Sequence, residues 1–261
     1  MDKWLVIPAL LGGALLGSFL CLVIERFPAG VNGRCWLQRI CRPPSRCGSC
    51  GHRLRLADLL PLLSWLWLRG RCRYCQQLIT RYPCYIELTS ALLLAVLVWH
   101  CYQRPALLAW LTLFSAVALV LSEIDRRHLL LPDALTLPLV WCGLLFNLHL
   151  SLHQLQQAVL GAMFGYLTLA SLWWLYYLRR QREGIGWGDI KYFAAIGAWT
   201  GLSALPLVAT LAAVLGIASW LAGQARREKT IQQPFGPCLS IAGWWVLLLQ
   251  HGETDWFNWL L

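Results

Sequence analysis

The chain has 261 residues, of which 58% are hydrophobic and only 13% are charged. A soluble domain carries about 25% charged residues, so a water-soluble globule of this length would leave much of its apolar surface exposed. The 16 tryptophans and 21 glycines suit membrane helices, because Trp collects at membrane interfaces and Gly is common in transmembrane helices. The composition argues against a soluble enzyme, a disordered linker and a secreted disulfide scaffold. It indicates an all-α polytopic membrane protein.

Eight apolar segments approach the roughly 20 residues that a membrane-spanning helix needs. We expect about eight transmembrane helices, at residues 4–24, 83–101, 105–124, 130–149, 156–178, 190–202, 204–222 and 237–250. The sixth segment is short, and we place its boundary with the seventh between Gly201 and Leu205. The first segment has no convincing cleavage site for a signal peptidase, so we interpret it as a retained span.

Positive charge is distributed unevenly between the two sides that these segments define. If the N-terminus lies outside, 20 of the 22 Lys and Arg residues fall on or next to the inner side. Cytoplasmic loops collect Lys and Arg, so we expect all the long loops to be cytoplasmic. The net charge of +10 is therefore a signal of topology, and we expect contact with the lipid bilayer and none with nucleic acid.

The topology predicts three regions in the chain. Residues 1–24 form the first transmembrane helix, residues 25–82 form a cytoplasmic loop long enough to fold, and residues 83–261 form a membrane domain of seven helices.

The cytoplasmic loop contains two Cys-x-x-Cys pairs, Cys47 with Cys50 and Cys72 with Cys75, separated by 21 residues. Structural disulfides are rare in the reducing cytoplasm. Each pair can present two thiolates to one ion, and two pairs complete a tetrahedron around zinc. A loop with little core of its own would gain folding energy from the metal. We expect a structural zinc site; the alternatives are free buried thiols or a redox pair.

Two aspartates lie at the cytoplasmic ends of predicted spans, where ionisable groups are often functional. Asp125 closes the third span, and Asp189 opens the sixth within the sequence Gly186-Trp187-Gly188-Asp189. Two carboxylates that meet cannot both ionise easily and share one proton, which supplies the base and the acid that peptide hydrolysis needs. The two glycines allow close approach of the backbone or a positive φ.

Simpler roles remain open for these acids. An aspartate at a membrane edge often caps a helix or forms an ion pair, here with Arg126, Arg127 or Lys191. Asp133, which follows Pro132, is expected to be the N-terminal cap of the fourth span rather than a third functional acid.

The chain resembles the type IV prepilin peptidases along nearly its whole length. The motifs that carry the resemblance are both cysteine pairs, Gly17-Ser18-Phe19-Leu20, Val23-Ile24-Glu25-Arg26-Phe27-Pro28, Pro61-Leu62-Leu63-Ser64, Ile124-Asp125-Arg126-Arg127-His128, Gly186-Trp187-Gly188-Asp189-Ile190-Lys191 and Pro234-Phe235-Gly236-Pro237. No single motif is decisive, but their order and spacing together are specific.

The resemblance implies that Asp125 and Asp189 are the catalytic aspartates, with Gly186, Gly188 and Lys191 as supporting residues of the active site. The family consists of aspartic endopeptidases of the bacterial inner membrane, so the N-terminus, which the charge distribution places outside, would be periplasmic. Its members remove the basic leader of type IV prepilins and of type II secretion pseudopilins, after a glycine and at the cytoplasmic face. Many then methylate the new N-terminus with S-adenosylmethionine. Glu123 and Glu183 are weak candidates for contact with the basic leader.

Two positions depart from the family pattern: Cys21 stands where Asn is common, and Ile185 where Met is common. The first lies in a motif that is sometimes linked with methylation, so it puts the methyltransferase activity in doubt and leaves the aspartates untouched. No residues for S-adenosylmethionine can be assigned from the sequence.

Three other functions are weighed against the peptidase. A transporter would not need the cysteine loop, and the segments show no inverted repeat. A zinc protease needs an open metal position, which four thiolates do not leave. A non-catalytic assembly factor of a pilus or secretion system is the main alternative, and it should tolerate the loss of either aspartate.

Overall fold

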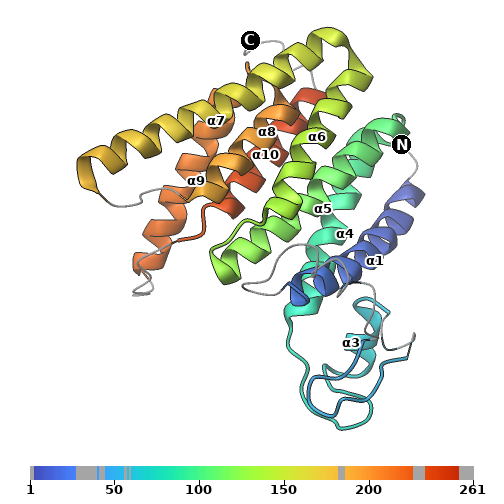
Figure 1. Cartoon of the computed structure of the whole chain (residues 1–261). Helices are drawn as coiled ribbons and strands as arrows, with labels where there is room; N and C mark the ends of the chain where they lie inside the picture. Colours follow the sequence, from blue (N-terminus) through green and yellow to red (C-terminus); the bar gives the residue numbers. More distant parts are fainter. Residues whose placement is uncertain are drawn as a thin grey trace. The chain divides into compact units, whose positions relative to one another are not determined.

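The computed structural model describes residues 3–27, 40, 45–55, 58, 60–181, 186–225 and 233–252. A short 3-10 helix, η1 (Lys3–Leu5), precedes the α-helices. The α-helices, labelled in Figure 1, are α1 (Val6–Glu25), α3 (Leu63–Trp67), α4 (Tyr82–Cys101), α5 (Pro105–His128), α6 (Asp133–Leu150), α7 (Leu152–Arg180), α8 (Trp187–Thr200), α9 (Leu205–Ala225) and α10 (Gly236–His251). Outside the helices, two isolated β-bridges occur in the described part of the chain.

Each of the eight predicted segments coincides with a helix, which confirms the prediction of an all-helical membrane protein. Among the described residues, six helices are long and apolar enough to cross a membrane, namely α1, α4, α5, α6, α7 and α9. The two others, α8 and α10, have 14 and 16 residues. The boundary between the sixth and seventh segments lies where it was predicted: α8 ends at Thr200, and the next residue, Gly201, has a φ of +78° that stops the helix.

The chain divides into two compact units, Met1–Thr112 and Leu113–Leu261, and the boundary falls within α5. In the first unit, α1 and α4 pack closely through small residues. A Cβ added to Gly13 would lie 2.6 Å from the Cα of Ala91, and one added to Gly17 would lie 2.7 Å from the Cα of Glu87. Small residues spaced four apart let membrane helices approach in this way.

In the second unit, α8 is the central helix, in contact with α6, α7 and α10 (Figure 1). Every residue from Ile190 to Thr200 except Lys191 is buried. The side chain of Asn147 on α6 donates to the carbonyl oxygens of Ala198 and Trp199 at 3.0 and 3.2 Å. Because other helices surround α8, its length is not set by the thickness of the lipid.

Candidate active site and candidate metal site

Asp125 lies in the last turn of α5, which continues to His128 instead of ending at the predicted residue 124. Its side chain is buried, with 5% of the residue exposed. One carboxylate oxygen, Oδ2, accepts the backbone N–H of Gly236 at 2.8 Å. Gly236 is the first residue of α10, so the carboxylate faces the positive end of a helix, where negative charge is stabilised.

Asp189 lies in the first turn of α8. Gly186, which precedes that helix, has φ −71°. A glycine at this position is therefore explained by the close approach of its backbone to Asp189 and not by a positive φ. A Cβ added to Gly186 would lie 3.1 Å from Oδ2 of Asp189, and one added to Gly188 would lie 2.8 Å from the Cβ of Leu131. Both glycines therefore leave room for tight packing around the acid.

The two aspartates are brought together although 64 positions separate them. Asp125 is near enough to Asp189 for their carboxylates to interact electrostatically. The Oδ1 atom of Asp189 is buried and has no hydrogen-bond partner among the described residues. Buried carboxylate oxygens are normally hydrogen-bonded, so this atom is available to a proton, a water molecule or a substrate.

One helical turn from the site lies a cluster of three hydroxyl groups that was not predicted from the sequence. Ser122, Tyr192 and Ser240 lie one helical turn from Asp125, Asp189 and Gly236 respectively. The Ser240 hydroxyl is 2.6 Å from that of Ser122 and 2.7 Å from that of Tyr192. The cluster therefore links α5, α8 and α10 one helical turn away from the site. The only signal in the sequence was the one-turn spacing of Ser122 from Asp125 and of Tyr192 from Asp189.

The two Cys-x-x-Cys pairs form two turns of the same design. The N–H of Cys47 donates to the carbonyl oxygen of His52, and the N–H of Cys72 donates to that of Gln77, both at 2.9 Å. A β-bridge closes each turn, Arg46 with Arg53 and Arg71 with Leu78. The residue after each second cysteine has a positive φ, +68° at Gly51 and +56° at Gln76.

The four sulfur atoms of Cys47, Cys50, Cys72 and Cys75 all lie within 4.8 Å of one another. The Cys47 and Cys75 sulfurs are 3.8 Å apart. A tetrahedron with Zn–S bonds of about 2.3 Å has edges of about 3.8 Å. The predicted four-cysteine cluster is therefore assembled, and its dimensions suit a tetrahedral metal ion.

The electrostatics of the thiols also favour a cation. The backbone N–H groups of Cys50 and Ser49 lower the pKa of Cys47 to about 6. The N–H of Gln77 lowers the pKa of Cys75, but burial and the three neighbouring thiols raise it to about 11. Without a cation, the first thiol of such a group loses its proton easily and the last does so with difficulty. A bound metal ion would stabilise all four groups as thiolates, because its positive charge offsets the repulsion between them.

Comparison with known proteins covers both units. Residues 11–101 match the bacterial peptidase A24 N-terminal domain, and residues 112–221, which contain both aspartates, match the type IV leader peptidase family. The chain belongs to the type IV leader peptidase family.

Several proteins resemble this leader peptidase family member along most of its length. A protein of Dickeya chrysanthemi is 43% identical, covering 94% of this chain and 93% of its own. Proteins of Aeromonas hydrophila and Dichelobacter nodosus are each 42% identical, covering 93% and 90% of this chain and 90% and 88% of their own. All three carry the name prepilin leader peptidase/N-methyltransferase. No solved structure matches.

Lys191 forms an ion pair with Asp133 and not with Asp189, which lies two residues before it in the sequence. Its ammonium group binds both carboxylate oxygens of Asp133 at 2.8 Å, which joins the first turn of α8 to the first turn of α6. Asp133 is not the N-terminal cap of its helix, as we expected from the sequence. Pro132 occupies the cap position, and Asp133 is the first helical residue.

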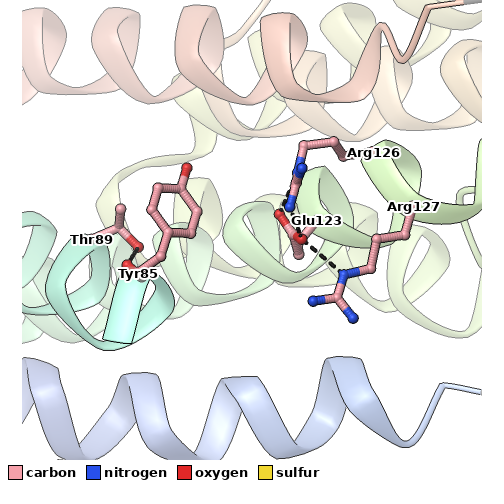
Figure 2. Close-up of polar contacts among 5 residues, drawn as sticks. All are labelled: Tyr85, Thr89, Glu123, Arg126 and Arg127. Atoms are coloured by element: carbon pink, nitrogen blue, oxygen red, sulfur yellow. Dashed lines mark hydrogen bonds and ion pairs between the residues drawn. The ribbon is translucent and has the colours of Figure 1, made fainter. Parts of the chain in front are cut away.

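Glu123, a candidate for contact with a basic leader, already has two partners (Figure 2). The Arg126 side chain binds both of its oxygens, and Nε of Arg127 donates to Oε1 at 2.9 Å. A leader that bound Glu123 would have to displace an arginine. Glu183 and Ile185 lie outside the described residues, and Cys21 is a buried residue of α1.

Proposed function

We propose that this leader peptidase family member is an aspartic endopeptidase that removes the basic leader of prepilins or type II secretion pseudopilins and then methylates the new N-terminus. The observation that carries the proposal is the proximity of buried Asp125 to Asp189, whose Oδ1 atom is also buried, within the region that matches the family.

In the proposed reaction, the two carboxylates hold one proton between them. We assign the ionised role to Asp125, because the Gly236 N–H and the start of α10 stabilise its negative charge. Asp125 takes a proton from water, whose oxygen attacks the carbonyl carbon of the scissile peptide bond. Asp189 gives its proton to the departing nitrogen as the C–N bond breaks. The pair again holds one proton at the end.

Three residues support this pair in our proposal. Gly186 and Gly188 leave the space that Asp189 and its helix occupy. Lys191 fixes the first turn of α8, and with it Asp189, through its ion pair with Asp133. Gly236 is added as a fourth supporting residue, because a Cβ there would lie 2.8 Å from Oδ2 of Asp125.

We further propose that Cys47, Cys50, Cys72 and Cys75 hold a structural zinc ion as thiolates. Four thiolates complete the coordination of zinc and leave no position for water. The ion would stabilise the segment of residues 25–82 and take no part in bond cleavage.

The proposed location is the bacterial inner membrane. In this topology, the N-terminus is periplasmic, and the zinc segment and the active site of the membrane domain (residues 83–261) lie at the cytoplasmic side. The excess of Lys and Arg in the corresponding loops supports this orientation. S-adenosylmethionine is the proposed methyl donor, and we assign no residue of this chain to it.

The test is incubation of the purified protein with a prepilin and, separately, with a pseudopilin, in the presence of S-adenosylmethionine. Mass spectrometry of the product should show loss of the leader after a glycine and one added methyl group. A non-catalytic assembly factor would leave both substrates intact.

A further inference from the structure

The short helix α3 turns an apolar face outward. Leu63, Leu66 and Trp67 are 57%, 70% and 87% exposed. Residues at positions i, i+3 and i+4 lie on the same face of a helix, so the three form one continuous patch. Trp65 packs toward the metal segment instead, since a Cβ added to Gly70 would lie 3.0 Å from its ring.

A buried carboxylate fixes the start of this helix beside a membrane span. The N–H of Leu62 donates to Oε2 of Glu87 at 2.8 Å. Glu87 is the sixth residue of α4, about 7.5 Å along the axis from its start. Leu62 has φ +57°, a conformation that L-residues seldom adopt, and the hydrogen bond helps to hold it. The helix α3 therefore begins beside the first two turns of a membrane-spanning helix.

The exposed apolar patch has positively charged neighbours. Arg69 and Arg71 follow α3 directly, and Arg81 immediately precedes α4; all three are exposed. In Figure 1, α3 is drawn on the side of the first unit where α1 ends and α4 begins. Apolar residues with Trp, flanked by arginines at the end of a span, are the pattern of a segment that lies in a membrane interface.

We propose that Leu63, Leu66 and Trp67 insert into the interface of an anionic lipid bilayer, at the membrane face where α1 ends and α4 begins. The arginines lie at the level of the lipid phosphates. Only four residues lie between Trp67 and Cys72, so α3 fixes the four-cysteine cluster at the membrane face. The proposal depends on α1 and α4 crossing the membrane, and it is independent of the proposed peptidase chemistry.

A lipid surface fits this patch better than a protein partner does. The bond to Glu87 already places α3 at the depth of the bilayer interface, and lipid is present there at all times. A protein partner, such as the apolar helix of a substrate, would have to displace that lipid. It is the competing occupant in the experiment.

The experiment places the photoreactive residue p-benzoylphenylalanine at position 67 of the full-length, metal-loaded protein in nanodiscs of anionic lipid. After illumination, intact mass measurement identifies what has been bound covalently. Two further positions serve as controls: Phe19, which is 54% exposed on α1, reports that the chemistry reaches lipid, and Leu78, which is 73% exposed on the second cysteine turn, is matched in exposure.

We expect lipid adducts at positions 67 and 19 and none at position 78. An adduct of position 67 with an added prepilin or with a second copy of the chain would contradict the proposal. Absence of a lipid adduct at position 67, when position 19 gives one, would contradict it equally.

A second measurement does not depend on the photoreactive residue. Replacement of Leu66 and Trp67 by Ser should speed amide hydrogen exchange of residues 63–68 in nanodiscs, while the metal content stays unchanged. Leu78→Ser is the matched control and should leave that exchange as it is. Equal exchange of residues 63–68 in the double variant and the wild type would overturn the proposal.

Discussion

The four cysteines are held by two short turns of the chain, whereas the two aspartates are held by the packing of three helices. Each turn is closed by a backbone hydrogen bond and a β-bridge within eight residues. Asp125 and Asp189, in contrast, come from α5 and α8, and Asp125 is also bound by the first residue of α10. One site is therefore local in sequence, and the other exists only in the folded bundle.

This difference indicates how each site should fail. Loss of a cysteine removes a metal ligand and loosens one segment, but it leaves the carboxylates in place. Under the proposed mechanism, loss of a carboxylate should abolish cleavage and leave the fold intact, because the buried helix contacts around the site do not depend on its charge.

Asp125→Asn and Asp189→Asn should each lower the cleavage rate on the order of a thousandfold or more, because catalytic groups that act as a unit fail together. Asn keeps the shape of the side chain but cannot exchange the proton. The measurement is the rate of prepilin cleavage by the purified variants, with thermal unfolding as a check on folding. Retention of about a tenth of the wild-type rate in either variant would refute the assignment of the pair.

Gly236→Ala should lower cleavage by roughly tenfold to a hundredfold, because displacement of a catalytic group by about 1 Å has effects of that size. The added Cβ would lie 2.8 Å from Oδ2 of Asp125 and force the carboxylate to move. Gly243→Ala is the control on the same helix, since its Cβ would lie 3.0 Å from a methyl group of Ile196. It should lower the melting temperature and spare the rate; the same loss of rate in both variants would mean that packing alone is responsible.

Cys47→Ser or Cys72→Ser should remove the metal and lower cleavage by about tenfold or less. Metal content by elemental analysis and limited proteolysis of residues 25–82 are the measurements, and the segment should become more sensitive to protease. Cys84→Ser, at a half-buried position of α4 outside the cluster, should retain the metal. A wild-type preparation free of metal but with a fully ordered segment would show that the ion is not structural.

Lys191→Met and Asp133→Asn should have small and similar effects on cleavage, each less than about fivefold. Their ion pair is partly exposed, with side-chain exposures of 33% and 54%, and such pairs contribute about 1 kcal/mol or less. Cleavage rates of the two single variants and the double variant are compared. A much larger loss in Lys191→Met than in Asp133→Asn would mean that Lys191 acts on Asp189 directly and not through Asp133.

The sequence predicted what depends on local pattern and on apolar length. The eight helices could be placed within a few residues because each is a continuous apolar segment, and the spacing of Cys47, Cys50, Cys72 and Cys75 was enough to predict their cluster. The paired aspartates were expected from their equal depth and from the family resemblance.

Contacts between side chains that belong to no motif could not be predicted from the sequence. The hydroxyls of Ser122, Tyr192 and Ser240 belong to three helices and form no motif, so their meeting depends on how those helices pack. The cap of α6 was wrongly expected at Asp133, because that carboxylate binds Lys191, 58 positions away. Glu123 looked available to a leader until both neighbouring arginines were seen to bind it.

The most direct test of the contrast between the two sites compares the effect of metal removal with the effect of losing a carboxylate. Cleavage of prepilin under single-turnover conditions is measured for the chelator-treated wild-type protein and for metal-loaded Asp189→Asn. We predict slowed but measurable cleavage by the metal-free protein and none by the metal-loaded variant. Cleavage by metal-loaded Asp189→Asn, together with a metal-free wild type that is inactive but still folded, would place the chemistry at the cysteine cluster and contradict the account.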